Sequence, residues 1–170
     1  MNDILYMREC ITLAEEARAL DEVPVGAIGV CDGRVVGRGY NRRETSHCAT
    51  HHAEIVAIEE ACATMGGWRL PNSTLYVTME PCPMCAGAAV NARIERVVWG
   101  VSDLRAGAFG SVVNLCDLPL NHKPTLEGGV LAEECKALLT DYFRAKRKAQ
   151  KEDKQKGQTL PDQTEGATDA

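Results

Sequence analysis

Long hydrophobic runs and an excess of positive charge are both missing from this chain of 170 residues. No apolar run approaches the roughly 18 residues needed to cross a bilayer, so we expect no membrane partner. The first four residues, Met1 to Ile4, lack the basic region and the apolar core of an export signal, which predicts a cytoplasmic protein. The formal net charge of −5 argues against indiscriminate nucleic-acid binding, although a local basic patch is compatible with RNA.

Eight cysteines are the unusual part of the composition. In a secreted chain they would suggest disulfides, but only Cys82 and Cys85 form a closely spaced pair, so a reduced protein with a metal site is the expectation. Hydrophobic residues make up 45% of the chain, enough for one compact domain with a core. We assign residues 1–150 to this single domain and expect residues 151–170, which are polar, to form a disordered tail.

The spacing of apolar residues predicts alternating helices and strands. Helices are expected over residues 2–20, 52–65 and 83–91, with a long final helix after Gly128-Gly129, and strands over 25–31, 34–40, 74–79 and 96–100. Asp32-Gly33 predicts a tight hairpin between the first two strands. The later order of strand, helix and strand predicts a parallel pair with a crossover helix.

The expected hairpin is rich in glycine, at positions 26, 29, 37 and 39. Glycine within a strand often marks a close approach to the backbone. Either a packed helix or a bound substrate accounts for such an approach, and the two interpretations have equal weight.

A His-x-Glu triplet, His52 to Glu54, is followed downstream by Cys82 and Cys85 in a Pro-Cys-x-x-Cys motif. One imidazole and two thiolates make three zinc ligands, and a tetrahedral zinc then keeps one position open for water, as catalytic sites do. His52 is expected in the first turn of its helix, and Glu54 is placed to move protons instead of binding metal. This combination is typical of zinc nucleobase deaminases.

The expected chemistry is hydrolysis of an aromatic amidine. Zinc lowers the pKa of bound water from 15.7 towards roughly 7. Glu54 takes a proton from this water, and the resulting hydroxide attacks the amidine carbon. Glu54 then returns protons to the ring nitrogen and to the departing amine, so that ammonia leaves and a carbonyl replaces the amine.

Other interpretations of the cysteine pair explain less. A redox pair would usually lie in a thioredoxin-like context. A closed structural zinc site needs a fourth ligand, for which Cys48 and His51 are near, but it leaves Glu54 and Glu80 without a role. His51 is a second possible ligand beside His52, and the spacing to Glu54 favours His52.

Beyond these motifs, the chain resembles the bacterial tRNA-specific adenosine deaminases within the cytidine-deaminase-like superfamily, over roughly residues 4–148. The segments that carry the resemblance are residues 22–27, 41, 52–55, 74–82, 84–88, 103, 107–111, 121–122, 134–139 and 143–144. The central motifs specify only the superfamily. The Gly-Ala-Phe-Gly-Ser loop at 107–111 and the final helix favour the tRNA enzymes over free-base deaminases.

The resemblance implies an α/β, three-layer fold with a central five-stranded mixed sheet flanked by helices, one zinc per subunit, and a homodimer. It implies conversion of the wobble adenosine to inosine in a tRNA anticodon stem-loop, usually that of arginine tRNA. Asn41 would bind the flipped nucleotide, and Asp103 and Asn121 would contact neighbouring nucleotides. Phe143 would pack beside the loop.

Two competing functions remain at this level. A deaminase of a free base, such as guanine or cytosine, would use the same zinc site without a basic RNA surface. A non-catalytic zinc module would need neither Glu54 nor a substrate. The final helix ends in basic residues, Arg144, Lys146, Arg147, Lys148 and Lys151, which would hold phosphates in the tRNA enzyme and be merely solvated in the others.

Overall fold

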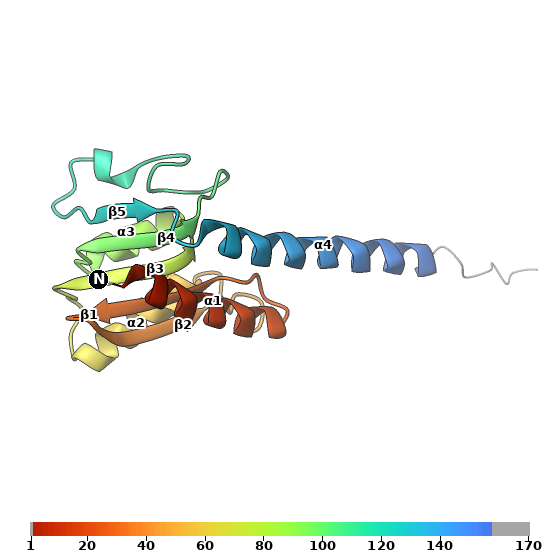
Figure 1. Cartoon of the computed structure of the whole chain (residues 1–170), viewed down its shortest axis with the longest axis horizontal. Helices are drawn as coiled ribbons and strands as arrows, with labels where there is room; N and C mark the ends of the chain where they lie inside the picture. Colours follow the sequence, from red (N-terminus) through yellow and green to blue (C-terminus); the bar gives the residue numbers. More distant parts are fainter. Residues whose placement is uncertain (1, 158–170) are drawn as a thin grey trace, which may run out of the picture.

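A computed structural model describes residues 2–157 of the chain (Figure 1). Five strands form one mixed sheet in the order β2-β1-β3-β4-β5. Their bounds are β1 (Gly26–Cys31), β2 (Arg34–Tyr40), β3 (Ser73–Met79), β4 (Arg96–Val101) and β5 (Thr125–Gly128). β1 runs antiparallel to β2 and β3, whereas β3, β4 and β5 are parallel to one another. The expected five-stranded mixed sheet is confirmed.

Helices cover both faces of the sheet and complete the expected three layers (Figure 1). Their bounds are α1 (Asp3–Ala19), α2 (Ala53–Met65), α3 (Pro83–Asn91) and α4 (Ala132–Gly157), with a 3-10 turn η1 (Leu115–Asp117). α2 and α3 pack on one face, where Leu75 and Val77 point. α1 and the start of α4 pack on the other, where Tyr76 lies. Because both faces are covered, the central strands β1 and β3 are buried almost throughout.

The turn between β1 and β2 follows the expected chemistry. Asp32 and Gly33 both have positive φ, 48° and 74°. Such angles at both central positions define the turn that matches the twist of a two-residue hairpin. The hairpin prediction is therefore confirmed.

Glycines in the hairpin let the helices lie against the sheet. A Cβ added at Gly37 would lie 2.2 Å from the carbonyl oxygen of Ala57, and one at Gly39 would lie 2.2 Å from that of Ala53, both in α2. On the other face, a Cβ at Gly26 would lie 2.1 Å from the carbonyl oxygen of Cys10 in α1. Helix packing, rather than substrate access, accounts for these three positions.

The structure differs from the sequence-based expectations at several boundaries. Residues 125–128 form β5, which the sequence pattern did not predict because only Leu126 of its four residues is even partly buried. His52 is the N-cap of α2 instead of part of its first turn. Within residues 2–157, no helix is long and apolar enough to cross a bilayer.

The polar tail expected from residue 151 onwards needs correction, because α4 continues to Gly157. Residues 145–156 contain neither glycine nor proline, and Lys148 lies 4.0 Å from Glu152 one turn later. Good helix formers and i,i+4 ion pairs support a helix even without burial. The rest of the expected tail, residues 158–170, lies outside the described residues.

We predict that Gly37→Ala lowers the free energy of unfolding by about 1–3 kcal/mol, because the new methyl group collides with the backbone of α2. The matched control is Gly87→Ala in α3, where an added Cβ meets nothing within 4 Å. It should leave stability unchanged or raise it by roughly 0.5–1 kcal/mol. Urea unfolding of both variants checks this, and equal effects would contradict the packing role of Gly37.

Candidate active site

Two helix N-termini meet at the carboxyl end of β3 and form the centre of the site. His52 caps α2, Cys82 caps α3, and Cys85 lies in the first turn of α3. Pro83, at the first position of α3, has no backbone N–H to leave unpaired and favours a sharp start to the helix. The positive ends of both helix dipoles point at this region, which favours thiolates and other anions.

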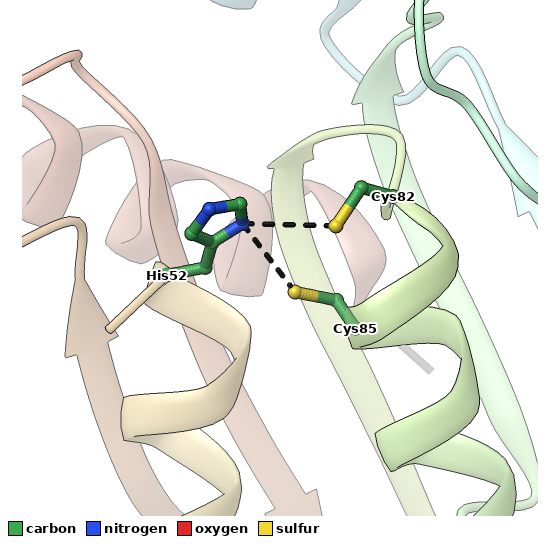
Figure 2. A group of neighbouring side chains, drawn as sticks. All are labelled: His52, Cys82 and Cys85. Carbon is green, nitrogen blue, oxygen red and sulfur yellow. Dashed lines mark hydrogen bonds between the residues drawn. The ribbon is translucent and has the colours of Figure 1, made fainter. Parts of the chain in front are cut away.

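The three predicted metal ligands converge (Figure 2). The Nδ1 atom of His52 lies 3.7 Å from the Sγ of Cys82 and 3.6 Å from the Sγ of Cys85. Tetrahedral zinc with ordinary Zn–N and Zn–S bonds holds its nitrogen and sulfur ligands about 3.6 Å apart. The donor types and their spacing therefore fit zinc.

The described residues form no closed four-ligand site. Among the described residues, the group with metal-ligand spacing contains His52, Cys82 and Cys85 alone. The Nδ1 of His51 lies 2.8 Å from the Oγ of Ser46, and the Sγ of Cys48 lies 3.3 Å from the Oγ1 of Thr50. Three protein ligands with an open fourth position are the arrangement of a catalytic zinc site.

The two ligand cysteines differ in acidity. A hydrogen bond from the Cys85 thiol, followed by one from His52, lowers the pKa of Cys82 to about 4. The same contact with Cys82, together with burial, raises the pKa of Cys85 far above its ordinary value. The hydrogen bond to Cys82 also raises the pKa of His52.

Glu54 lies in the first turn of α2 and is almost completely buried. Burial raises the pKa of its carboxyl group to about 7, and the Cys85 thiol is a direct hydrogen-bond neighbour. A general acid and base works best with a pKa near the working pH. The position and acidity of Glu54 fit the predicted role of proton carrier.

A small cavity of about 150 Å³ opens onto this centre. Its lining includes His52, Glu54 and Cys82, together with Asn41 and Asp103, two of the predicted substrate-binding residues. Drug-sized ligands usually occupy pockets of about 300–1,000 Å³, so this cavity suits a single small ring system. The site residues predicted around the metal are therefore brought together.

The other two predicted substrate-binding residues lie outside this cavity. Phe143 lines a neighbouring cavity, which shares Val23, Met79 and Asp103 with the first. Asn121 lines neither of the two, and its Oδ1 accepts a hydrogen bond of 3.0 Å from Arg93 near the end of α3.

Two buried glutamates, Glu80 and Glu22, organise the cavity, although neither was among the predicted site residues. Glu80 accepts hydrogen bonds from the backbone N–H groups of Asp103, Phe109 and Ser111, each 3.1 Å long, and from the Ser111 hydroxyl. Glu22 accepts hydrogen bonds from the side-chain amide of Asn41 and from the backbone N–H of Thr45. The available signal for Glu80 was a charged residue directly after a strand that the sequence predicts to be buried.

Residues 1–101 match the family model of the cytidine and deoxycytidylate deaminase zinc-binding region. The matched residues include His52, Cys82 and Cys85, and the fold and the site together define a zinc-dependent deaminase. Its cofactor is zinc.

Curated relatives specify the family further. The chain is 47% identical to the tRNA-specific adenosine deaminase of Bacillus subtilis over 88% of this chain and 93% of the relative. It is 43% identical to that of Haemophilus influenzae over 94% of both. A solved structure from work on A-to-I editing by tRNA:A34 deaminases at the wobble position of transfer RNA superposes with a TM-score of 0.77 and 41% identity, over 79% of this chain and 98% of that one. The chain belongs to the family of tRNA-specific adenosine deaminases.

We predict that zinc binding releases protons and tightens as pH rises from 6 to 8. The reason is that Cys85, whose pKa is raised, must lose its thiol proton to become a ligand. Calorimetric titration of the metal-free protein in two buffers of different ionisation enthalpy measures the released protons. Cys48→Ser, outside the ligand group, should leave affinity and proton release unchanged, and zinc binding without proton release would contradict the assignment.

Proposed function

We propose that this chain converts the wobble adenosine of a tRNA anticodon stem-loop to inosine, with arginine tRNA as the expected substrate. The observation that carries the proposal is the zinc-ligand triad beside the buried carboxyl group of Glu54, at a cavity of single-base size. Water and adenosine are consumed, and inosine and ammonia are produced.

The residues around the cavity have different roles in the proposed reaction. Bound zinc supplies Lewis-acid activation of water. Glu54 takes up a proton and then delivers protons to the ring nitrogen and to the departing amine. Its pKa of about 7 lets the carboxyl group both accept and donate a proton near neutral pH. Asn41 and Asp103 orient the base from the cavity wall.

The surface next to the cavity supports an RNA substrate over a free base. The neighbouring cavity is lined by Phe143, Arg105 and Arg147, all exposed. Exposed aromatic and basic side chains together suit stacked bases and phosphates. A free base fills only the first cavity and needs none of these residues.

α4 extends away from the sheet (Figure 1). The helix bears Arg144, Lys148 and Lys151 as exposed cations beyond Phe143. A rise of about 1.5 Å per residue extends them roughly 12 Å from Phe143 to Lys151. We assign this stretch to the phosphates of the anticodon stem.

The remaining parts of the proposal concern Asn121, assembly and location. Asn121 contacts nucleotides beyond the cavity, from the side where Arg93 holds it. The chain forms a homodimer, for which the exposed side chains of Val113 and Leu118 offer apolar surface. Its single domain works in the cytoplasm, where a tRNA substrate is present and the metal-binding thiols stay reduced.

We predict that Glu54→Gln lowers kcat by about 10²–10⁴-fold, because the amide cannot carry the proton. The variant should retain one zinc per chain, because Glu54 is not in the ligand group. The assay follows inosine formation in an anticodon stem-loop with a wobble adenosine by mass spectrometry, and bound zinc by elemental analysis. Glu59→Gln, exposed on the same helix, is the control and should keep full activity.

The same assay includes free adenosine, adenine, guanine and cytosine. Inosine in the stem-loop alone supports the proposal. Turnover of a free base with untouched RNA would replace the proposal with the free-base deaminase, and full activity of Glu54→Gln would remove the proposed role of Glu54.

We predict that Arg147→Glu weakens stem-loop binding about tenfold or more at 0.1 M salt and lowers the slope of log Kd against log salt by about 1. The cause is loss of a phosphate contact beside the cavity. Arg34→Glu, an exposed residue of the hairpin with the same change of charge, should alter binding less than twofold. Fluorescence anisotropy with a labelled stem-loop measures both, and equal effects would mean that net charge alone matters.

A further inference from the structure

Glu22 is a fully buried carboxyl group directly behind the cavity wall. It lies between α1 and β1, next to Val23, which lines the cavity. Its Oε2 accepts a hydrogen bond of 3.0 Å from the side-chain Nδ2 of Asn41. Its Oε1 accepts from the backbone N–H of Thr45 at 2.6 Å and from the Thr45 hydroxyl at 2.9 Å.

This contact determines which way the amide of Asn41 faces. The two ends of an asparagine amide look alike in shape, and their identity follows from the hydrogen-bond partner. A carboxylate only accepts hydrogen bonds, so the NH₂ end of Asn41 must point to Glu22. Among the described residues, no group donates to the Oδ1 of Asn41, and the side chain lines the cavity beside Glu54. The free carbonyl end is therefore available to a ligand.

Anchoring of the loop does not depend on this contact. The backbone N–H of Asn41 is bound to the carbonyl oxygen of Val25 at 2.9 Å, and that of Arg42 to the carbonyl oxygen of His51 at 3.0 Å. Thr45 also holds the loop to Glu22 through two hydrogen bonds of its own. The bond between Glu22 and the Asn41 side chain fixes the orientation of an amide whose backbone is already placed.

We propose that Glu22 is a positioning residue that locks the Asn41 amide with its carbonyl oxygen towards the substrate nucleoside. The inference rests on the proposed function of the site. Asn41 then presents a fixed acceptor, Oδ1, and its second N–H as a donor. This pair suits a ligand that offers a hydroxyl or amine proton next to an acceptor, as a ribose or the edge of a purine does. A misdirected amide presents the wrong polarity to the same ligand and leaves it poorly oriented for attack.

Glu22→Gln tests this orientation directly. The new amide oxygen keeps the two Thr45 donors, so its NH₂ faces Asn41 and favours the reversed Asn41 amide. We expect kcat on the stem-loop to fall by about tenfold to a hundredfold, as for a misplaced orienting group. KM should change less than threefold, because phosphate contacts dominate RNA affinity. Thr45→Val removes a donor from the other oxygen and should change kcat less than twofold.

A double-mutant cycle separates positioning from general structural support. In an Asn41→Ala background, Glu22→Gln should change kcat less than twofold, because the group it orients is gone. The same loss of kcat in both backgrounds would overturn the proposal.

Hydrogen exchange of the Asn41 side-chain amide tests the proposal without substrate. It therefore remains informative if a variant does not fold or if the enzyme does not act on RNA. In ¹⁵N-labelled full chain, Asn41→Ala identifies the Asn41 side-chain amide signals. Their exchange with water should be at least tenfold slower than that of exposed Asn91, and faster after Glu22→Gln. Rapid exchange in the unsubstituted chain would overturn the role of Glu22, whereas slow exchange without any RNA turnover would support the amide lock and refute only the proposed function.

Discussion

The metal centre depends on how closely α2 approaches the sheet. The two distances of 3.6 and 3.7 Å from His52 to the cysteine sulfurs join the starts of two different helices. α3 follows β3 after three residues and is placed by it. α2 has no such short link, and its position comes from packing against β2, where Gly37 and Gly39 let backbone meet backbone. A methyl group at either glycine would push the ligand histidine away from the thiolates.

Three buried glutamates surround the site, and their partners explain their different roles. Glu80 accepts four hydrogen bonds and Glu22 accepts three, so both serve as fixed acceptors that shape the wall. Within residues 2–157, Glu54 has fewer donors, its own backbone N–H and the Cys85 thiol, and burial raises the pKa of its carboxyl group to about 7. A buried carboxyl group is either well hydrogen-bonded or more readily protonated. In the proposed mechanism, the first kind holds substrate-facing groups and the second kind moves protons.

The chain has a net charge of −5, but its charges are not spread evenly over the surface. Basic side chains gather on the outer turns of α4, beside the cavity that Phe143 lines. Screening limits the reach of each charge to about 10 Å, so this local patch can attract phosphates although the whole chain is acidic. The same helix thus packs against the sheet at its start and extends away from it (Figure 1), with exposed basic residues on its outer turns.

The sequence by itself determined most of the elements, and it predicted a set of metal ligands and a proton carrier that the fold brings together. His52, Glu54, Cys82 and Cys85 were predictable because zinc chemistry requires those donor types at a characteristic spacing. The central strands were predictable because they are buried on both faces and rich in β-branched and apolar residues, whereas β5 was not, since its side chains are mostly exposed. Only the tertiary structure decided the rest. It showed that hairpin glycines serve packing, that Asn41 and Asp103 share the cavity while Asn121 lies elsewhere, and that Glu22 and Glu80 organise the wall. The physical reason is that these roles depend on hydrogen bonds and close contacts between residues distant in the chain, which periodicity and spacing do not encode.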